Sequence, residues 1–142
     1  NRLTKLKKPK KIFMGEKDFQ QLYLVKNYIE KNYKSKIISC KTIRDKNNLA
    51  LSSRNLHLSK PELTKAGNIA TNVISFKKKI KNKKNLNKIL LEKKKELNKM
   101  FNISIEYIDL RNKFNLIKSN EVKNSKIFLA YYLNKIRLID NF

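Results

Sequence analysis

The stretch KKIFMGEKDFQQLYLVKNYIEKNY, residues 10–33, decides the fold prediction. Its short apolar run, residues 10–14, leads to Gly15 and is typical of a strand that ends at a corner. The residues that follow have helical spacing, and the apolar run SKIISCKT, residues 35–42, predicts a second strand. The order strand, helix, strand is typical of a parallel α/β layer.

The GEKD corner between the first strand and the helix is one candidate site. Asp18 and Gln21 have the spacing of a capping box, and the helix is expected to run to about Tyr33. Ligands bind beyond the carboxyl ends of strands in α/β sheets, and helix N-termini there favour anions. Gly15 would let a ligand approach the backbone and Lys17 adds a positive charge, so the corner suits a polyphosphate. A plain capped corner with a solvated Lys17 remains an open interpretation of the same residues.

A second candidate is LALSSRN, residues 49–55. It follows a loop-like stretch in which Asn47 and Asn48 suit a turn with positive φ. Its two hydroxyls and Arg54 can hold phosphate oxygens through hydroxyl, backbone N–H and guanidinium donors. The alternative is that the serines cap a turn and Arg54 pairs at the surface. The two candidates are more informative together, because both could face the same strand ends.

The part from residue 58 onwards begins with two predicted helices. Ser59 and Glu62 form a capping box with Pro61 in the first turn, and a second helix is expected over residues 86–101. The lysine-rich run FKKKIKNKKN, residues 76–85, is interpreted as a solvated connector between them. The residues expected to face inward are Leu63, Ala66, Ile69, Ala70, Val73, Ile74, Ile89, Leu90, Leu97 and Met100.

The remainder of the chain changes to a period of two. The stretches ISIEYIDL (residues 103–110), KIFLAYYL (126–133) and IRLIDNF (136–142) alternate like strands, with a tight hairpin at Asn134-Lys135. Residues 58–142 therefore predict an α+β domain of two helices and a small, largely antiparallel sheet.

Charge does not by itself define the function. The formal net charge is +24, which is typical of nucleic-acid-binding proteins. Only five of the 35 basic residues are arginine, the residue that binds phosphates and base edges bidentately. The lysine excess accompanies many Asn and Ile residues and spreads over both halves, which indicates compositional drift. A lysine-rich nucleic-acid-binding module stays the alternative of a different class.

Several other classes of protein or site find no support in the sequence. No run of 18 or more apolar residues and no secretory h-region is present, so we expect a cytoplasmic protein. The single cysteine, Cys40, rules out an internal disulfide and is expected to be a small buried hydrophobe. No metal-ligand spacing and no nucleophile–base pair is found, and the only histidine, His57, is interpreted as structural. The first residue is Asn1 rather than Met, which indicates a missing or trimmed start.

Three ordered motifs resemble one family. FMGEKDFQQL (13–22), TIRDKNNLALSSRN (42–55) and IRLIDN (136–141) resemble pantothenate synthetase, also called pantoate–β-alanine ligase, over essentially all 142 residues. The resemblance implies the C-terminal part of a Rossmann-like nucleotidyltransferase domain (residues 1–57) followed by a small α+β lid domain (58–142). It also implies ATP-dependent condensation of pantoate and β-alanine through a pantoyl adenylate. Magnesium would accompany the ATP, no covalent enzyme intermediate would form, and the full-length enzyme would be a homodimer.

The resemblance also assigns residues. Lys17 would be catalytic, neutralising charge on the phosphates during adenylation, and Gln21 would bind pantoate. Ile43 stands where the family has an apolar residue against adenine. The ATP-binding residues would be Gly15, Glu16, Lys17, Asp18, Ile43, Leu51, Ser52, Ser53 and Arg54.

The chain departs from the family pattern in four ways. Lys41 replaces a proline, Asp45 a glutamate and Asn48 a glycine, and asparagine tolerates the left-handed region better than most residues. The large departure is the absence of the family's N-terminal half, with its histidine motif and a second pantoate-binding glutamine. We therefore expect this chain alone to be inactive and either poorly soluble or partly molten, with only about residues 58–142 able to fold alone. A related adenylyl-transferring enzyme with another acid substrate remains a nearer alternative.

Overall fold

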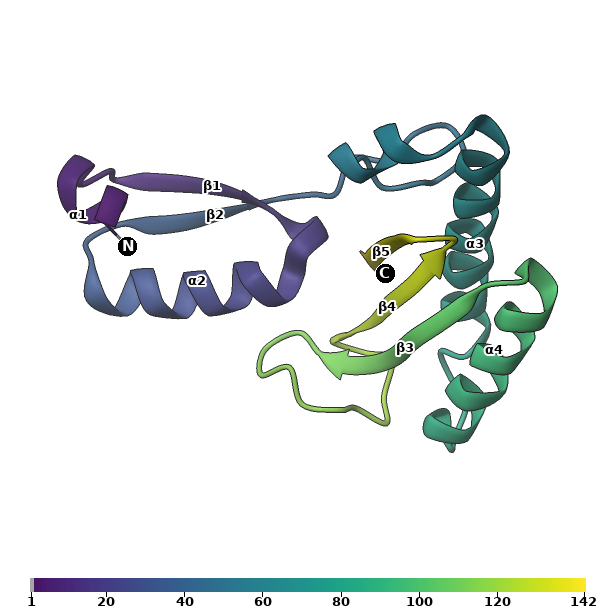
Figure 1. Ribbon diagram of the computed structural model, residues 1–142. Coiled ribbons are helices and arrows are strands. Elements are labelled where there is room, and N and C mark those ends of the chain that lie inside the picture. Colours follow the sequence, from purple (N-terminus) through teal and green to yellow (C-terminus); the bar gives the residue numbers. More distant parts are fainter. Residues whose placement is uncertain (1) are drawn as a thin grey trace. The chain divides into compact units, whose positions relative to one another are not determined.

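A computed structural model describes residues 2–142 of the protein (Figure 1). The chain forms two compact units, divided between Thr42 and Ile43. This division differs from the expected boundary between residues 57 and 58, because the segment 43–57 packs with the residues that follow it. Each unit is described by itself below.

The first unit is a strand–helix–strand layer, as predicted. Strands β1 and β2 pair in parallel, with Lys11 opposite Lys36 and Gly15 opposite Cys40. The intervening helix α2 covers one face of this two-stranded sheet, where Leu22 and Ile29 of the helix are buried together with Ile37 of β2. The elements of this unit are α1 (Arg2–Lys7), β1 (Lys11–Gly15), the 3₁₀ turn η1 (Glu16–Asp18), α2 (Phe19–Asn32) and β2 (Lys36–Cys40).

Two side chains of this sheet are more exposed than an intact core would leave them. Phe13, at the centre of β1, is 67% exposed, although its neighbours Ile12 and Met14 pack against the α2 side. Cys40, expected to be buried, is an exposed free thiol at the end of β2. Strand residues alternate between faces, so the exposure of Phe13 marks a sheet face that α2 does not cover.

The second unit begins with the segment 43–57. Leu49 and Leu58 lie in the same buried cluster as the helices and sheet that follow, which explains why the boundary falls before this segment. The expected turn at Asn47 and Asn48 is confirmed, since Asn48 has φ 67°. Its left-handed backbone accounts for the asparagine at this position. The segment ends in a 3₁₀ turn, η2 (Ser53–His57).

Two helices follow, α3 (Lys60–Lys79) and α4 (Leu86–Phe101). The capping box of Ser59 and Glu62 is confirmed at the start of α3, with Pro61 in its first turn. The stretch predicted as a connector is only partly one, because α3 continues to Lys79 and Phe76 and Ile80 pack into the core. The apolar anchors in that lysine-rich run extend the helix.

The inward-facing residues are largely as predicted. In α3, the residues Ala66, Ile69, Ala70 and Val73 are buried, and in α4 Leu90 and Leu97 are buried. The prediction that Met100 faces inward is wrong, because its side chain is 56% exposed near the end of α4. Its sulfur accepts a 3.8 Å hydrogen bond from the Asn72 Nδ2 amide instead.

The sheet of the second unit is antiparallel, as predicted, in the order β3-β4-β5. Its strands are β3 (Ser104–Asn112), β4 (Ser125–Leu133) and β5 (Ile136–Asn141). The hairpin between β4 and β5 turns at Asn134, whose φ is 51°. Helix α4 packs on β3 and helix α3 on β4 (Figure 1).

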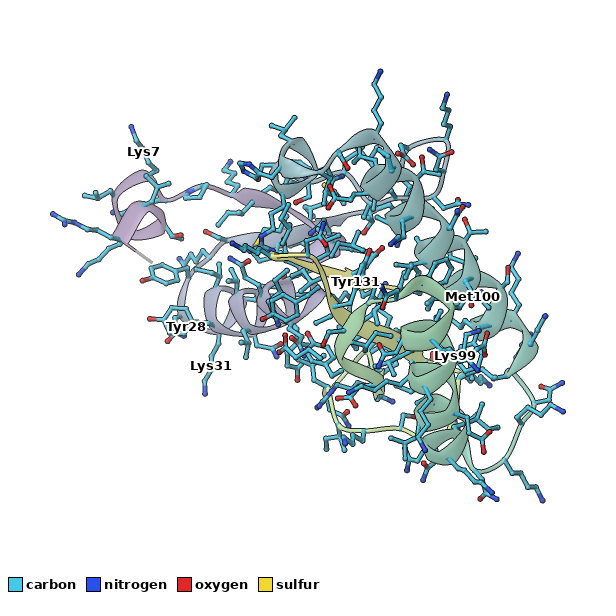
Figure 2. The ribbon with its side chains drawn as sticks, turned by 45° about the vertical axis from the view of Figure 1, so that its right-hand side comes forward. Lys7, Tyr28, Lys31, Lys99, Met100 and Tyr131 are labelled. Carbon is cyan, nitrogen blue, oxygen red and sulfur yellow. The ribbon has the colours of Figure 1, made fainter. Side chains whose placement is uncertain are left out.

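Figure 2 shows the side chains on the ribbon, including Tyr131 in the sheet and lysines on the surface. Tyr131 of β4 is 3% exposed, and burial beside the Asp140 carboxylate raises the pKa of its hydroxyl above the ordinary value. The labelled lysines Lys7 and Lys31 instead project away from the ribbon (Figure 2). Within residues 2–142, no helix combines the length and apolarity that a membrane crossing requires.

Candidate functional site

The first group of predicted site residues lies at the carboxyl edge of the β1–β2 sheet. Because Gly15 and Cys40 are opposite each other in the parallel register, both strands end at the same edge. Glu16, Lys17 and Asp18 follow β1 as the 3₁₀ turn η1, and α2 begins directly after them. The corner therefore occupies the position at which ligands bind in open α/β sheets.

The capping box predicted at this corner is wrong. Asp18 makes no side-chain capping bond, and its backbone (φ −97°, ψ 59°) lies outside the extended region that an N-cap residue adopts. The 3₁₀ turn of residues 16–18 places Asp18 inside a helical turn rather than before it. Gln21, in the first turn of α2, is exposed and is not held by a cap.

Nothing inside the described chain requires a glycine at position 15. Its φ of −71° and ψ of 139° suit any residue. A Cβ built on Gly15 would meet no atom within 4 Å. The backbone at the end of β1 is therefore open, and a ligand could approach it closely.

Lys17 is not simply a solvated lysine. Its side chain is 18% exposed, and its Nζ lies 4.0 Å from Asp18 Oδ1, at the outer limit of an ion pair. Lys17 is therefore a largely covered lysine whose positive charge lies beside a carboxylate at the end of β1.

The second group of site residues lies in the second unit, on a small hairpin. Arg44 and Ala50 form an isolated antiparallel bridge, and the Leu51 N–H donates to the Ile43 carbonyl at 3.0 Å. Ile43 and Leu51 are thus opposite each other, with 71% and 53% of their surfaces exposed. Two large apolar side chains side by side in water form a surface suited to a flat apolar group.

The serines and arginine follow this hairpin directly. The Ser52 hydroxyl accepts a 3.3 Å hydrogen bond from the Arg54 N–H and caps η2, so the predicted serine-capped turn is confirmed for Ser52. Ser53 and Arg54 are exposed on the first turn of η2. Within residues 2–142, the Arg54 guanidinium has no hydrogen-bond or ion-pair partner, so the predicted surface pair is not formed. His57, at the end of η2, is also exposed.

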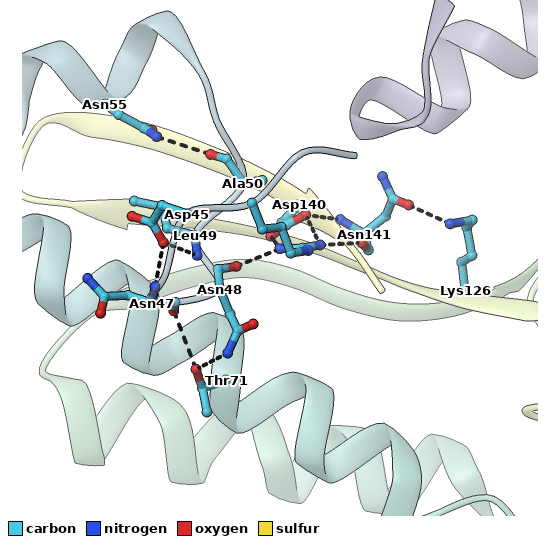
Figure 3. Close-up of polar contacts among 11 residues, drawn as sticks. Asp45, Asn47, Asn48, Leu49, Ala50, Asn55, Thr71, Lys126, Asp140 and Asn141 are labelled. Atoms are coloured by element: carbon cyan, nitrogen blue, oxygen red, sulfur yellow. Dashed lines mark hydrogen bonds and ion pairs between the residues drawn. The ribbon is translucent and has the colours of Figure 1, made fainter. Parts of the chain in front are cut away.

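The sequence did not reveal the role of Arg44. Its guanidinium donates to both Asp140 oxygens at 2.7 and 2.9 Å, to the Asn141 carbonyl at 3.0 Å and to the Asn48 carbonyl at 2.9 Å (Figure 3). It also lies 4.9 Å from the centre of the Phe142 ring. The bond joins TIRDKNNLALSSRN to IRLIDN, and only the ordered occurrence of those two motifs hinted at it.

The predicted site residues therefore fall into two groups, one in each unit. The first contains Gly15, Glu16, Lys17, Asp18 and Gln21, and the second contains Ile43, Leu51, Ser52, Ser53 and Arg54. Among residues 2–142, no group of three or more His, Cys, Asp or Glu side chains is arranged to hold a metal ion.

Comparison with known proteins decides the family. The family model for pantoate-beta-alanine ligase matches residues 1–142. The chain belongs to the pantoate-beta-alanine ligase family. The pantothenate synthetase of Flavobacterium psychrophilum is 35% identical over 144 aligned positions, which cover 99% of this chain and 51% of that protein.

Solved structures of the family have the same fold. The pantothenate synthetase of Thermus thermophilus superposes with a TM-score of 0.85 at 25% identity, covering 99% of this chain and 52% of that one. The pantoate-beta-alanine ligase of Francisella tularensis, solved with beta-gamma ATP and beta-alanine, superposes with a TM-score of 0.74 at 32% identity. That match covers 99% of this chain and 46% of the Francisella chain. The α/β fold with a small antiparallel sheet is thereby confirmed, and the chain spans about half the length of the relatives it matches.

Proposed function

We propose that this chain is the C-terminal half of an ATP-dependent pantoate–β-alanine ligase. The observation that carries the proposal is its match, over 99% of its length, to a family member solved with beta-gamma ATP and beta-alanine. In the proposed reaction, the pantoate carboxylate attacks the α-phosphorus of ATP, forming pantoyl adenylate and releasing pyrophosphate. The β-alanine amine then attacks the acyl carbon, loses a proton and releases AMP, giving pantothenate.

The residues at the end of β1 would bind the polyphosphate and pantoate. Open space above Gly15 lets phosphate oxygens approach the backbone. Lys17, whose ammonium lies beside Asp18 at this corner, would neutralise charge that develops on the phosphates as pyrophosphate leaves. Glu16 and Asp18 complete this ATP-binding corner, and Gln21, exposed on the first turn of α2, would bind pantoate through its amide.

The hairpin and η2 would bind the nucleoside and a phosphate. Ile43 and Leu51 present the exposed apolar surface on which an adenine would lie. The Ser53 hydroxyl and the Arg54 guanidinium would donate to phosphate oxygens, with Ser52 holding the turn. Binding and charge neutralisation of this kind account for catalysis without a covalent enzyme intermediate.

Magnesium would enter with the substrate as Mg–ATP. Protein sites hold Mg²⁺ through one or two carboxylates together with substrate phosphates, and Glu16 and Asp18 are carboxylates of the proposed phosphate corner. The cytoplasmic location stays a prediction from the sequence, and the homodimer of the longer enzyme stays a prediction of the family resemblance.

The test uses the chain joined to the upstream part that its relatives carry. Pyrophosphate release should require both ATP and pantoate, and AMP and pantothenate should then form with β-alanine. Replacement of pantoate by other hydroxy acids distinguishes the related adenylyl-transferring alternative. An extended protein that releases no pyrophosphate in response to pantoate contradicts the proposal.

Two lysine variants test the site. Lys17→Ala should lower the adenylation rate on the order of 10²-fold if the ammonium neutralises phosphate charge. Lys26→Ala, which removes an exposed lysine from the helix that follows, should leave the rate unchanged. Equal rates for both variants would return Lys17 to the role of a surface lysine.

The nucleic-acid alternative is not favoured by the family match. It predicts binding that persists at physiological salt and weakens steeply as salt rises. A filter-binding series with RNA and DNA across salt concentrations tests it directly.

A further inference from the structure

Hydrogen bonds within the hairpin of residues 43–51, and others to α3 and β5, hold the hairpin in place. Its bridge is closed by the Asp45 N–H, which donates to the Leu49 carbonyl at 2.9 Å. The Asp45 carboxylate also accepts from the N–H groups of Asn47 and Leu49, at 2.8 and 3.0 Å. These bonds fix the turn without help from the rest of the unit.

Two separate anchors then fasten the hairpin to the second unit. At the turn, the Asn48 Nδ2 amide donates to the Thr71 hydroxyl of α3 at 3.0 Å (Figure 3). At the open end, Arg44 binds Asp140 of β5 bidentately, and the Asp140 carboxylate is 8% exposed. The open end is also where the chain enters Leu51 and Ser52, so the Arg44–Asp140 bond is the anchor nearer to the proposed ATP-binding residues.

The two arginines of this motif therefore do different things. Four of the five N–H donors of Arg44 are used inside the protein, by Asn48, Asp140 and Asn141. The Arg54 guanidinium has no partner among residues 2–142, so its donors are available to a ligand. Arg44 is thus suited to holding the segment in place, while Arg54 is suited to contacting a phosphate.

We propose that Arg44 and Asp140 are a pair of positioning residues that hold the segment 43–54 in its ATP-binding conformation. The proposal rests on the proposed function of that segment. Without the bidentate bond the open end of the hairpin separates from β5, and Leu51 and the η2 turn lose their fixed position. Misplacement of a binding group by about 1 Å, from a change outside the chemistry, costs up to about 10²-fold in rate.

The molecule offers a matched control. Arg137 of the same strand, β5, binds Glu106 of β3 bidentately, at 2.6 and 3.1 Å. This pair lies on the sheet and makes no contact with the segment 43–54 among the bonds described. Glu106→Gln therefore removes an arginine–carboxylate bond of the same kind without releasing the hairpin.

The experiment compares Asp140→Asn with Glu106→Gln in the chain joined to its upstream part. Asp140→Asn should speed amide exchange in residues 43–55 by about tenfold or more, with exchange in α3 and α4 unchanged. It should also raise the KM for ATP by roughly 10- to 100-fold while the KM for pantoate changes little. Glu106→Gln should change neither quantity.

A second variant covers the event that Asp140→Asn does not fold. Arg44→Lys keeps the positive charge beside Asp140 but loses the planar fork, so it should show the same two effects to a smaller degree. Faster exchange with an unchanged KM for ATP would show a purely structural pair and overturn the proposal, as would unchanged exchange. A wild-type protein without activity would instead contradict the proposed function, and the exchange measurement separates the two failures because it needs no substrate.

Discussion

Gly67→Ala should destabilise the second unit, against the expectation from helix propensity. Gly67 lies in the interior of α3, where replacement of glycine by alanine ordinarily stabilises a helix by about 1 kcal/mol. Here a Cβ would lie 2.7 Å from the Asn47 Cβ and 2.8 Å from the Asn47 carbonyl oxygen. Carbon atoms in contact are roughly 3.5–4.0 Å apart, so the overlap is about 1 Å.

The hairpin cannot relieve this overlap at low cost. The Asn47 N–H is bound to Asp45, and the neighbouring Asn48 amide is bound to Thr71. Overpacking costs about 1–3 kcal/mol, and loss of the bond to Thr71 about 1 kcal/mol more. After the gain in helix propensity, the free energy of unfolding should fall by about 2 kcal/mol. For a unit of about 100 residues, this corresponds to a decrease in Tm of roughly 10 °C.

The assay is urea and thermal unfolding followed by circular dichroism, with Gly15→Ala as the control. These are the only two glycines of the chain, and a Cβ at Gly15 meets nothing within 4 Å. Gly15→Ala should leave stability unchanged or raise it by about 0.4–1 kcal/mol, because it restricts the unfolded chain. A Gly67→Ala protein as stable as wild type would refute the reasoning, since the contact with Asn47 would then carry no cost.

Three further predictions concern the second unit. Leu97→Ala should lower the free energy of unfolding, measured by urea titration, by about 2–5 kcal/mol because Leu97 is 0% exposed. Leu91→Ala on the same helix, where the side chain is 62% exposed, should lower it much less, and equal losses would contradict the core assignment. Hydrogen bonds from Ser59, then from Asn134, hold the pKa of the Glu62 carboxyl below its ordinary value of 4.5. The stability that ionised Glu62 contributes is therefore present above pH 4.5 and is lost as the pH falls through the lowered pKa. The stability difference between wild type and Glu62→Gln should vanish in acid, and a difference independent of pH would contradict this. Asn102 ends α4 with a left-handed backbone, φ 46°. Asn102→Val should therefore lower the free energy of unfolding by about 1–2 kcal/mol, whereas Asn102→Gly should be tolerated. Equal stabilities of the two variants in thermal unfolding would refute the role of the left-handed cap.

Much of the fold could be predicted because its signals are local. The capping box of Ser59 and Glu62, the helix over residues 86–101 and the hairpin at Asn134 depend on residues a few positions apart, and all three are confirmed. Met100 shows the limit of this reasoning. Helical spacing places it near the apolar face, but its side chain is 56% exposed, and the next residue, Phe101, packs against the core instead.

The candidate site could be predicted as motifs but not as geometry. The capping box at Asp18 was wrong because a 3₁₀ turn and an N-cap use the same residue types. The sequence predicts a boundary after residue 57 because residues 1–57 together have the strand–helix–strand order of a parallel α/β layer, whereas the compact units divide between Thr42 and Ile43. In the structure, residues 43–57 are held by hydrogen bonds to α3 and β5. These bonds join residues that lie too far apart in the sequence for a local pattern to predict them.

The anchor between Arg44 and Asp140 also has a consequence for the order of folding. The two residues are 96 positions apart, so the segment proposed to bind ATP cannot take its final shape until β5 has been synthesised and paired. Closing so long a loop carries an entropic cost that local turns avoid, and contacts of this kind form late. The hairpin itself can close early through Asp45, but the proposed nucleotide site is completed only once β5 has taken its place in the sheet.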